Sequence, residues 1–201
     1  ISLDYIRQEG QAQRLGQQLI AVVAEGENRV YLKPDDVSET AANIDNPSNG
    51  PHGVLTGKAM VNVPLYGMNH WEDLFTPRQL VALTTFSDLL PEVRERVITD
   101  AAASGVIDDG VRLRDGGSGV TAYADAITTY LAFVVDKCTD YWSTISTWAQ
   151  QGFVGHTFGR QAIAMTWDFA ETNPFSSSTG NWMSMVNWVQ KAVGHLPASG
   201  L

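Results

Sequence analysis

The feature that most constrains the fold is a long amphipathic pattern over residues 121 to about 151, where apolar residues recur at steps of three and four. A period of 3.6 residues places such side chains on one face of an α-helix. With a rise of about 1.5 Å per residue, a helix of this length spans about 45 Å. The pattern therefore predicts one long central helix as the spine of the chain. Its apolar stripe consists of Tyr123, Ile127, Tyr130, Leu131, Val134, Cys138, Tyr141, Ile145 and Trp148.

Further amphipathic segments favour helices around this spine. The clearest begins at Thr76, which can cap a helix with Pro77 at its first position, while Gln79 can return a hydrogen bond to the Thr76 amide. This helix is predicted to continue to about Ala103, with Pro91 bending or dividing it. The other predicted helices cover residues 2–26, 36–43, 159–170 and 182–193.

The segments between these helices complete the predicted architecture. Residues 29–33 favour one short strand, which Pro34 ends. Residues 43–69 are rich in Asn, Pro, Gly and Ser, which is typical of a loop that binds a ligand, is disordered or wraps another part of the protein, and wrapping is favoured. We therefore predict a mainly α, multi-helix module with one long central helix and at most a short strand pair. Its parts are an N-terminal helix and strand over 1–42, a loop or linker over 43–70 and a helical core over 71–201.

Composition argues against several classes of protein and site. The longest apolar run has six residues, at 19–24, whereas a membrane span needs roughly 20, so we expect no membrane contact. A single cysteine excludes an internal disulfide and a Cys-rich zinc site, and the four scattered histidines lack metal-ligand spacing. We expect no metal and a reducing, cytoplasmic location. Because the chain starts without Met or a basic leader, we also expect it to be part of a longer polypeptide.

The charge restricts how this chain could meet DNA. Its formal net charge is −9, with 22 acidic and 13 basic residues, whereas DNA affinity comes largely from Lys and Arg that neutralise phosphates. Any contact must therefore use a local patch. Arg78, and Arg160 with Gln161, lie at predicted helix starts, where backbone amides also favour anions. Arg112 and Arg114 precede a glycine-rich loop and are the next candidates. The alternative for each arginine is a structural ion pair with a carboxylate.

Other motifs give little support to catalysis by this chain. Asn173-Pro174-Phe175 partly matches the base-binding motif of amino-methyltransferases but lacks the second proline, so a turn is favoured. The run 115–119 has no strand before its glycines, which favours a flexible connection over a phosphate loop. The tryptophans and Cys138 are expected in the core. The aspartates at 125, 136, 140 and 168 are expected on solvated helix faces. We assign no catalytic, cofactor-binding or metal-binding residue.

Several blocks, in one order along nearly the whole chain, resemble the large adenine-specific DNA methylases described as containing a Zn-ribbon module. The two most specific blocks are Asp73-Leu74-Phe75-Thr76-Pro77-Arg78-Gln79-Leu80 and Thr157-Phe158-Gly159-Arg160-Gln161-Ala162. The other blocks cover residues 4–10, 21–26, 29–32, 66–68, 82–86, 123–126 and 167–175.

The resemblance implies a parent enzyme of several hundred residues that transfers a methyl group from S-adenosylmethionine to adenine N6. It also implies that the glycine-rich cofactor motif lies upstream of this region and the Asp-Pro-Pro-Tyr catalytic motif downstream, since neither occurs here. The zinc ribbon is absent too. This region is therefore expected to hold no cofactor and to be inactive alone, with the rest of the parent methylase as its partner and DNA reached through the parent.

Two hypotheses of different classes follow. In the first, the chain is a helical module that shapes the DNA cleft or helps to recognise the target, with Arg78, Arg112, Arg114, Arg160 and Gln161 as contact candidates. In the second, it is a non-catalytic scaffold that braces the catalytic domain or binds a partner protein. The family resemblance favours the first hypothesis and the acidic charge the second. A third reading, an independent enzyme, has no motif in its support.

Overall fold

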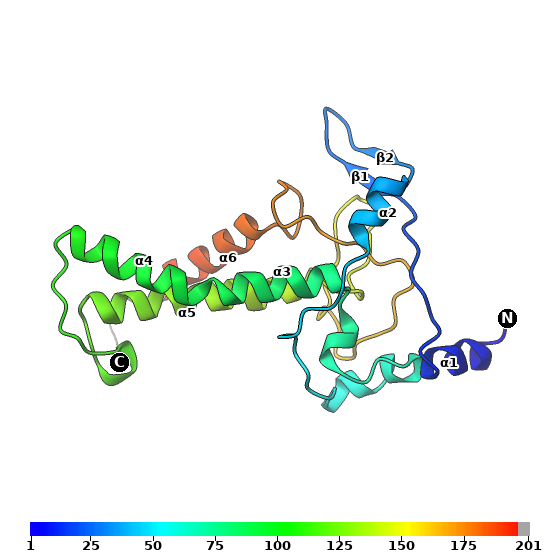
Figure 1. Ribbon diagram of the computed structural model, residues 1–201, viewed down its shortest axis with the longest axis horizontal. Coiled ribbons are helices and arrows are strands. Elements are labelled where there is room, and N and C mark those ends of the chain that lie inside the picture. The colour runs from blue at the N-terminus through cyan, green and yellow to red at the C-terminus, as the bar shows by residue number, and fades with distance from the viewer. Residues whose placement is uncertain (197–201) are drawn as a thin grey trace.

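A computed structural model describes residues 1–196 and shows a mainly α protein with one short strand pair (Figure 1). The α-helices are α1 (Leu3–Gln11), α2 (Asp36–Ala42), α3 (Pro77–Asp88), α4 (Leu90–Ala103), α5 (Val120–Thr139) and α6 (Trp182–Gly194). The short 3-10 helices are η1 (Gly57–Met60), η2 (Val63–Tyr66), η3 (Trp71–Leu74) and η4 (Leu113–Asp115). The strands β1 (Val22–Ala24) and β2 (Val30–Leu32) pair antiparallel, with Val23 opposite Tyr31.

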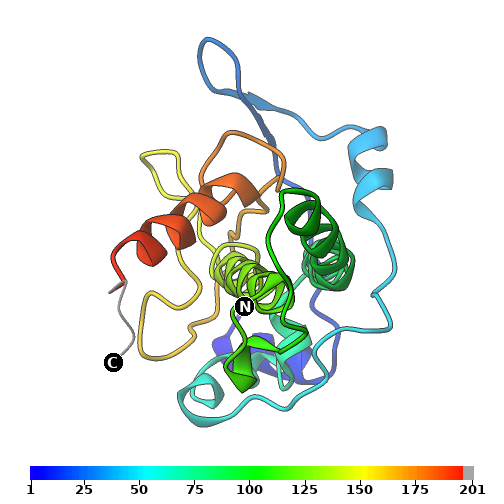
Figure 2. The same ribbon diagram turned by 90° about the vertical axis from the view of Figure 1, so that its left-hand side faces the viewer.

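The molecule is elongated and has two differently built regions. Helices α3 to α6 and η4 form a helical arm, which extends from a loop body made of residues 1–76 and 140–180 (Figure 1). A view along the arm shows α5 between the α3–α4 pair on one side and α6 on the other (Figure 2). The central helix predicted from the apolar period is therefore α5.

The start of α3 confirms the predicted capping box. The Thr76 hydroxyl accepts a hydrogen bond from the Gln79 amide (3.3 Å), and Gln79 Oε1 accepts one from the Thr76 amide (2.9 Å). Helices α3 and α4 are separated only at Leu89, whose backbone stays in the right-handed region, and Pro91 lies in the first turn of α4. Of the two predicted alternatives at Pro91, a bend or a division, the structure has a bend within one long helical segment.

The central helix is shorter than predicted. Helix α5 ends at Thr139, so its 20 residues span about 30 Å instead of about 45 Å, and the predicted continuation to residue 151 is wrong. Beyond Asp140 the backbone bonds to other segments, for example the Thr144 amide to the Leu74 carbonyl (2.8 Å). Tyr141 and Ile145 of the predicted stripe are buried all the same. At these two positions the apolar period predicted burial correctly although the backbone is a loop, whereas Tyr123 of the same stripe is 52% exposed.

The predicted N-terminal helix over 2–26 is also too long. Ser2 caps α1 as expected, with its hydroxyl accepting from the Tyr5 amide (3.2 Å), but the chain leaves the helix after Gln11 and Gln13 adopts a positive φ of 56°. The reason is tertiary, because Gly10 packs directly on the Tyr66 backbone and the Gln13 side chain donates to the Gly67 carbonyl (2.9 Å). The later part of the predicted helix forms β1, the partner of the predicted strand.

Two of the three remaining predicted helices are confirmed, as α2 and α6. The third, over residues 159–170, is wrong, because this segment consists of bends and irregular backbone, with one isolated bridge from Phe169 to Thr147. Its backbone is bound by distant groups, with the Met165 amide donating to Asn62 Oδ1 (2.7 Å) and the Ala170 amide to the Ser146 carbonyl (2.8 Å). Backbone amides that donate to distant acceptors cannot form the hydrogen bonds of a helix within the segment.

Two apolar clusters form the core. One lies among α3, α5 and α6 and includes Leu83, Val134, Cys138, Trp142 and Met185. The other lies in the loop body and includes Leu55, Ala59, Val63, Leu74, Ile145 and Ile163. Residues 43–69 therefore wrap the body and contribute to its core, which was the favoured one of the three predicted alternatives.

Only some of the residues expected in the core are buried there. Burial raises the pKa of the Cys138 thiol to about 12, as expected for an unreactive core cysteine. Trp142 is also buried, but Trp167 and Trp188 are 57% and 59% exposed, so the prediction of core tryptophans does not hold for these two. None of the helices within residues 1–196 is both long and apolar enough to span a bilayer.

Candidate functional site

The predicted DNA-contact residues do not converge on one surface. Arg78, in the first turn of α3, donates from Nε and Nη2 to both carboxylate oxygens of Glu171 (2.8 and 2.5 Å). Its Nη1 also donates to the Ala42 carbonyl. A bidentate pair of this kind fixes the guanidinium plane. Arg78 therefore fits its alternative role as a structural residue, joining α3 to two segments of the loop body.

Arg160 and Gln161 do not lie at a helix start. Because residues 159–170 form no helix, the backbone amides expected to assist Arg160 with an anion are not presented there, and this premise of the prediction is wrong. Gln161 Oε1 instead accepts a hydrogen bond from Lys58 Nζ (2.9 Å). Arg160 is exposed on the loop body and remains a surface cation.

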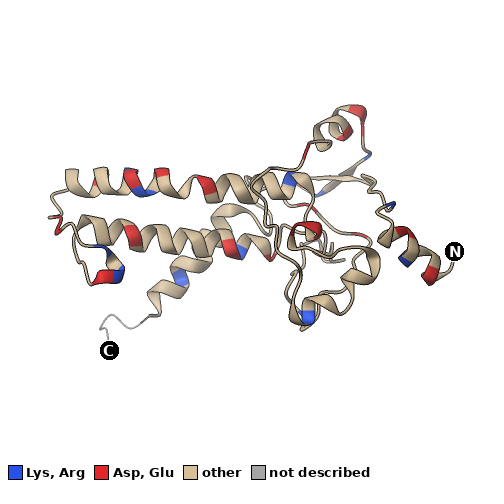
Figure 3. Ribbon diagram, turned by 60° about the horizontal axis from the view of Figure 1, so that its bottom comes forward, with Lys and Arg blue, Asp and Glu red and all other residues tan. Residues whose placement is uncertain are grey.

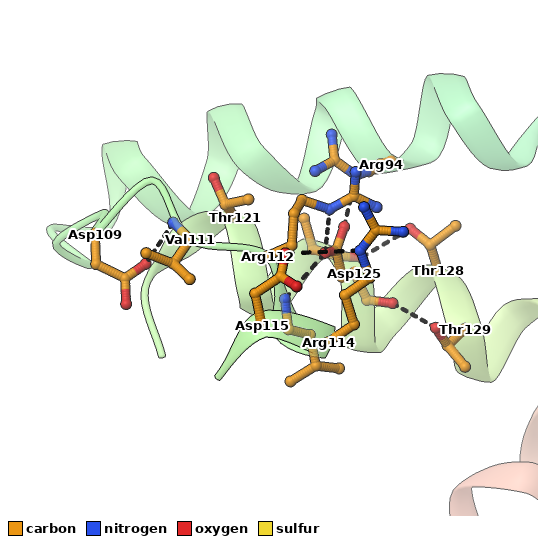
Figure 4. Close-up of polar contacts among 12 residues, drawn as sticks. Arg94, Asp109, Val111, Arg112, Arg114, Asp115, Thr121, Asp125, Thr128 and Thr129 are labelled. Carbon is orange, nitrogen blue, oxygen red and sulfur yellow. Dashed lines mark hydrogen bonds and ion pairs between the residues drawn. The ribbon is translucent and has the colours of Figure 1, made fainter. Parts of the chain in front are cut away.

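Arg112 and Arg114 lie together on the distal part of the helical arm, where Arg94 of α4 joins them. The three arginines line an open hollow of about 430 Å³ whose opposite wall is α5. Figure 4 shows Arg94 of α4 and Arg112, at the start of η4, meeting Asp125 of α5. We call this feature the arginine hollow; it is lined by Arg94, Arg112, Arg114, Asp125, Thr128 and Thr129 together with Leu113 and Ala132.

The loop before the hollow is ordered by two aspartates. Asp108 accepts hydrogen bonds from the amide and hydroxyl of Thr121 (both 2.9 Å) and so satisfies the first turn of α5. Asp109 accepts from the amides of Ser118 (2.8 Å) and Val111 (3.0 Å). These backbone hydrogen bonds lower the pKa of both carboxyls. The aspartates thereby fix the position at which the chain enters η4.

The glycine run 115–119 is a packed turn and not an open connection. A Cβ on Gly117 would lie 2.1 Å from the Val111 carbonyl oxygen, and a Cβ on Gly119 would lie 2.5 Å from the Asp109 amide nitrogen. Both contacts are shorter than any side chain tolerates, so glycine is required by close approach of the backbone. The turn holds Arg112 and Arg114 against the start of α5.

Asp125 is the centre of the hollow. Its Oδ2 accepts from Arg112 Nε (2.5 Å) and the Leu113 amide (3.2 Å), while Oδ1 accepts from Arg94 Nε (2.9 Å). The hydrogen bonds from Arg112 and Arg94 hold the pKa of Asp125 far below its usual value, although desolvation opposes them. Its side chain is only 9% exposed. The expectation that Asp125 lies on a solvated face is therefore wrong.

The hollow is positively charged within an acidic protein. Three arginines and one aspartate line it, so the lining has a formal charge of +2, which Glu95 and Asp115 offset while they pair with Arg94 and Arg114. Both remaining ion pairs are at the surface: Arg94 with Glu95 (3.1 Å) and Arg114 with Asp115 (3.6 Å), whose acidic partners are 72% and 59% exposed. Surface pairs of this kind contribute little and exchange readily. An anion could replace either carboxylate at small cost.

Sequence patterns selected Arg112 and Arg114 but not Arg94 or Asp125. Arg94 lies 31 residues before Asp125 in the chain, and the two meet only because α4 packs along α5. The one local signal is an aspartate on the otherwise uncharged first half of α5, between the buried residues Ala122 and Val134. A carboxylate in such a place requires a cationic partner, although its identity is not encoded locally.

A second polar cluster joins the end of α5 to residues 156–158. Asp140 accepts hydrogen bonds from Lys137 Nζ (2.8 Å), His156 Nδ1 (2.7 Å) and the Phe158 amide (3.0 Å). Burial disfavours the Asp140 carboxylate, but these bonds outweigh it and lower the pKa. The Asp140 side chain is 13% exposed, so the prediction that it lies on a solvated helix face is wrong as well.

This aspartate–histidine pair resembles half of an acid–base site, but the nearby hydroxyl groups are not available to a substrate. Ser143 and Ser146 are fully buried and both hydrogen-bond Thr157 (2.7 and 3.2 Å). His156 Nε2 itself lies 3.3 Å from the Tyr141 hydroxyl. The cluster therefore has a structural role, in which it holds residues 156–158 against the end of α5.

The Asn173-Pro174-Phe175 motif forms the predicted turn. Asn173 Oδ1 accepts from the Phe175 amide (3.0 Å), and the Pro174 carbonyl accepts from the Trp182 amide at the start of α6 (2.9 Å). Phe175 is 85% exposed. The asparagine side chain is therefore engaged by its own backbone, as in an ordinary Asx turn.

Comparisons with known proteins identify no relative of this chain. The chain matches no family model, no curated protein and no solved structure. Within residues 1–196, no three or more His, Cys, Asp or Glu side chains are grouped so that they could hold a metal ion. The function is therefore best approached through the arginine hollow and the sequence resemblance.

Proposed function

We propose that this chain is an internal helical region of an S-adenosylmethionine-dependent, adenine-specific (N6) DNA methyltransferase, in which it helps to shape the DNA cleft. The resemblance of residues 73–80 and 157–162 to that family supports the enzyme class. The observation that carries the DNA-contacting role is the arginine hollow, with three guanidinium groups in one depression of an acidic protein. Its partners would be the rest of the parent enzyme and, through it, DNA in the cytoplasm.

The position of the hollow reduces the effect of the acidic charge. Figure 3 shows acidic residues on both the arm and the loop body, with basic and acidic residues side by side at η4. Asp125, at the centre of the hollow, lies 14 residues before Thr139, where α5 ends beside the loop body, and this is about 20 Å along the helix. The Debye length is about 8 Å at physiological ionic strength. A phosphate at the hollow would therefore experience its local positive charge more than the acidic body.

A bracing scaffold is the second candidate, and specific contacts favour it. Arg78 is fully engaged with Glu171, which removes the arginine best placed at a helix start. Large apolar side chains are also exposed on separate parts of the surface, including Ile107 (86%), Phe175 (85%) and Trp188 (59%). Because they are scattered and form no continuous patch, these side chains add little to this reading, which depends on the engagement of Arg78. In this reading the module supports the catalytic domain without touching DNA.

Duplex binding by the isolated chain distinguishes the two candidates. We expect weak binding in low salt, measured by fluorescence anisotropy, which Arg112→Gln with Arg114→Gln abolishes. Each lost phosphate contact should reduce the slope of log affinity against log salt by about 1. Arg96→Gln is the matched control, since Arg96 lies on the same arm but pairs with Asp100 and is 78% exposed. Equal losses in the control and the double variant, or no binding at all, would favour the scaffold.

The absence of a cofactor motif gives an independent check. The isolated chain should show no heat of binding with S-adenosylmethionine in calorimetry, because no glycine-lined nucleoside pocket is predicted from its sequence. A dissociation constant in the micromolar range would contradict the proposed division of the parent enzyme.

A further inference from the structure

We propose that the arginine hollow is a specific seat for one phosphate group carried on a sugar, with the phosphate on the arginine side and the sugar against α5. For its biological role this inference rests on the proposed function, but the binding chemistry can be tested separately. The shared ligand chemistry is a sugar phosphate, which could come from a free nucleotide or from a DNA strand.

The arginine side of the hollow has unused donors. A guanidinium group carries five N–H bonds, and both Arg94 and Arg112 bind Asp125 through Nε alone. Only one further bond, from Arg94 Nη1 to the exposed Glu95, joins either guanidinium to another side chain within residues 1–196. Because Asp125 is held by both arginines at once, it keeps the two groups next to each other. Asp125 is thus a positioning residue that leaves most of the donor capacity free.

The opposite wall of the hollow has the reverse chemistry. The hydroxyls of Thr128 and Thr129 donate to the carbonyls of Ala124 and Asp125 (both 2.7 Å). Because each hydroxyl has one hydrogen, neither can donate to a phosphate, although both can still accept. Leu113 and Ala132 add apolar surface nearby. A wall of acceptors and apolar groups suits the hydroxyl and carbon atoms of a sugar, whereas it would repel a phosphate.

The size of the hollow agrees with a ligand larger than a lone phosphate. Its volume of about 430 Å³ falls within the roughly 300–1,000 Å³ typical of small-molecule sites. Once an anion displaces Glu95 and Asp115, the formal charge of +2 on the lining matches a phosphate monoester, which carries nearly two negative charges at neutral pH, and exceeds the single charge of a phosphodiester. The two sources of the ligand should therefore differ in affinity.

The test uses the full chain labelled with nitrogen-15 and follows the arginine Nε–H signals by NMR. The probes are deoxyadenosine 5′-monophosphate, inorganic phosphate, deoxyadenosine and a short DNA duplex. We expect the monophosphate to shift the signals of Arg94, Arg112 and Arg114, inorganic phosphate to shift the same signals more weakly, and deoxyadenosine to shift none. The signal of Arg96 should not move.

Variants test the arginine side and the α5 side of the hollow independently. Arg114→Gln keeps the Asp125 pairs and should weaken both phosphate probes about tenfold, as expected for one charge-assisted hydrogen bond. Thr128→Val with Thr129→Val should weaken the monophosphate but leave inorganic phosphate unchanged. Arg96→Gln should change neither.

Each outcome supports or overturns the proposal. Shifts spread over Arg96 and other exposed arginines, or none at the hollow, would overturn it. Monophosphate binding without duplex binding would support the seat and contradict the DNA-contacting function. Duplex binding that leaves Arg94, Arg112 and Arg114 unshifted would overturn the seat while leaving that function to another surface.

Discussion

The helical arm and the loop body form their cores by different means. In the arm, backbone groups bond within each helix, and side chains at helical spacing pack α3, α5 and α6 around Trp142 and Val134. In the loop body, backbone groups bond to distant partners, such as the Thr144 amide to the Leu74 carbonyl. Hydroxyl clusters and glycine contacts there take the place of regular structure. The comparison shows that burial and backbone geometry can be specified separately.

The largest expected effect is at the junction of the two regions. Trp142 is 1% exposed, and its Nε1 donates to the Gly180 carbonyl (2.7 Å). Trp142→Ala should lower the free energy of unfolding by about 3–5 kcal/mol, because it leaves a cavity and an unpaired carbonyl. Trp188→Ala, at an exposed tryptophan, should cost less than about 1 kcal/mol. Urea unfolding of both variants measures the difference, and equal losses would contradict this packing.

The next effect tests the close backbone contacts of the loop body. A Cβ on Gly10 would lie 2.4 Å from the Tyr66 carbonyl oxygen, which is backbone and cannot swing away. Overpacking costs about 1–3 kcal/mol, more than the roughly 1 kcal/mol that alanine gains over glycine in a helix. Gly10→Ala should therefore destabilise the protein and expose α1 to hydrogen exchange.

Gly16→Ala is the matched control for this contact, because no atom lies within 4 Å of the added Cβ. It should leave stability unchanged or raise it by a few tenths of a kcal/mol by restricting the unfolded chain. Unchanged exchange of α1 in Gly10→Ala would show that α1 does not dock through this glycine.

A smaller effect belongs to the arm alone. Thr76→Ala removes the cap of α3 and should cost about 1 kcal/mol, seen as a lower melting temperature. Thr76→Ser retains the hydroxyl and should recover most of the loss. If serine were as destabilising as alanine, the buried methyl group of Thr76 would matter more than the cap.

The last prediction concerns the pH dependence of stability at the arginine hollow, which should change nothing near neutral pH and appear only in acid. The hydrogen bonds from Arg112 and Arg94 lower the pKa of Asp125 in the folded protein, so the unfolded chain takes up this proton more readily. The resulting stabilisation is fully present above the unfolded value of about 3.9 and is lost as pH falls below it. NMR titration of the Asp125 carboxyl carbon should show no protonation at pH 4, and a midpoint near 4 would contradict the pairing.

Much of the arm could be predicted from the sequence, because its signals are local. The Thr76 capping box, the bend at Pro91 and the start of α5 each depend on residues within a few positions of one another. The same holds for α2, α6 and the turn at Asn173. Of the hollow, Arg112 and Arg114 were predicted candidates because they flank a glycine run.

Only the tertiary structure decided where helices end and which charges meet. The apolar period continued beyond Thr139 and predicted burial of Tyr141 and Ile145, but hydrogen bonds to distant segments replaced the helix there. Asp125 meets Arg94 because α4 packs along α5, and no local pattern encodes a pair 31 residues apart. The physical reason is the separation along the sequence over which each signal acts. Periodicity, caps and prolines act within a turn or two of the backbone. Ion pairs and close glycine contacts instead depend on how distant parts of the chain pack together.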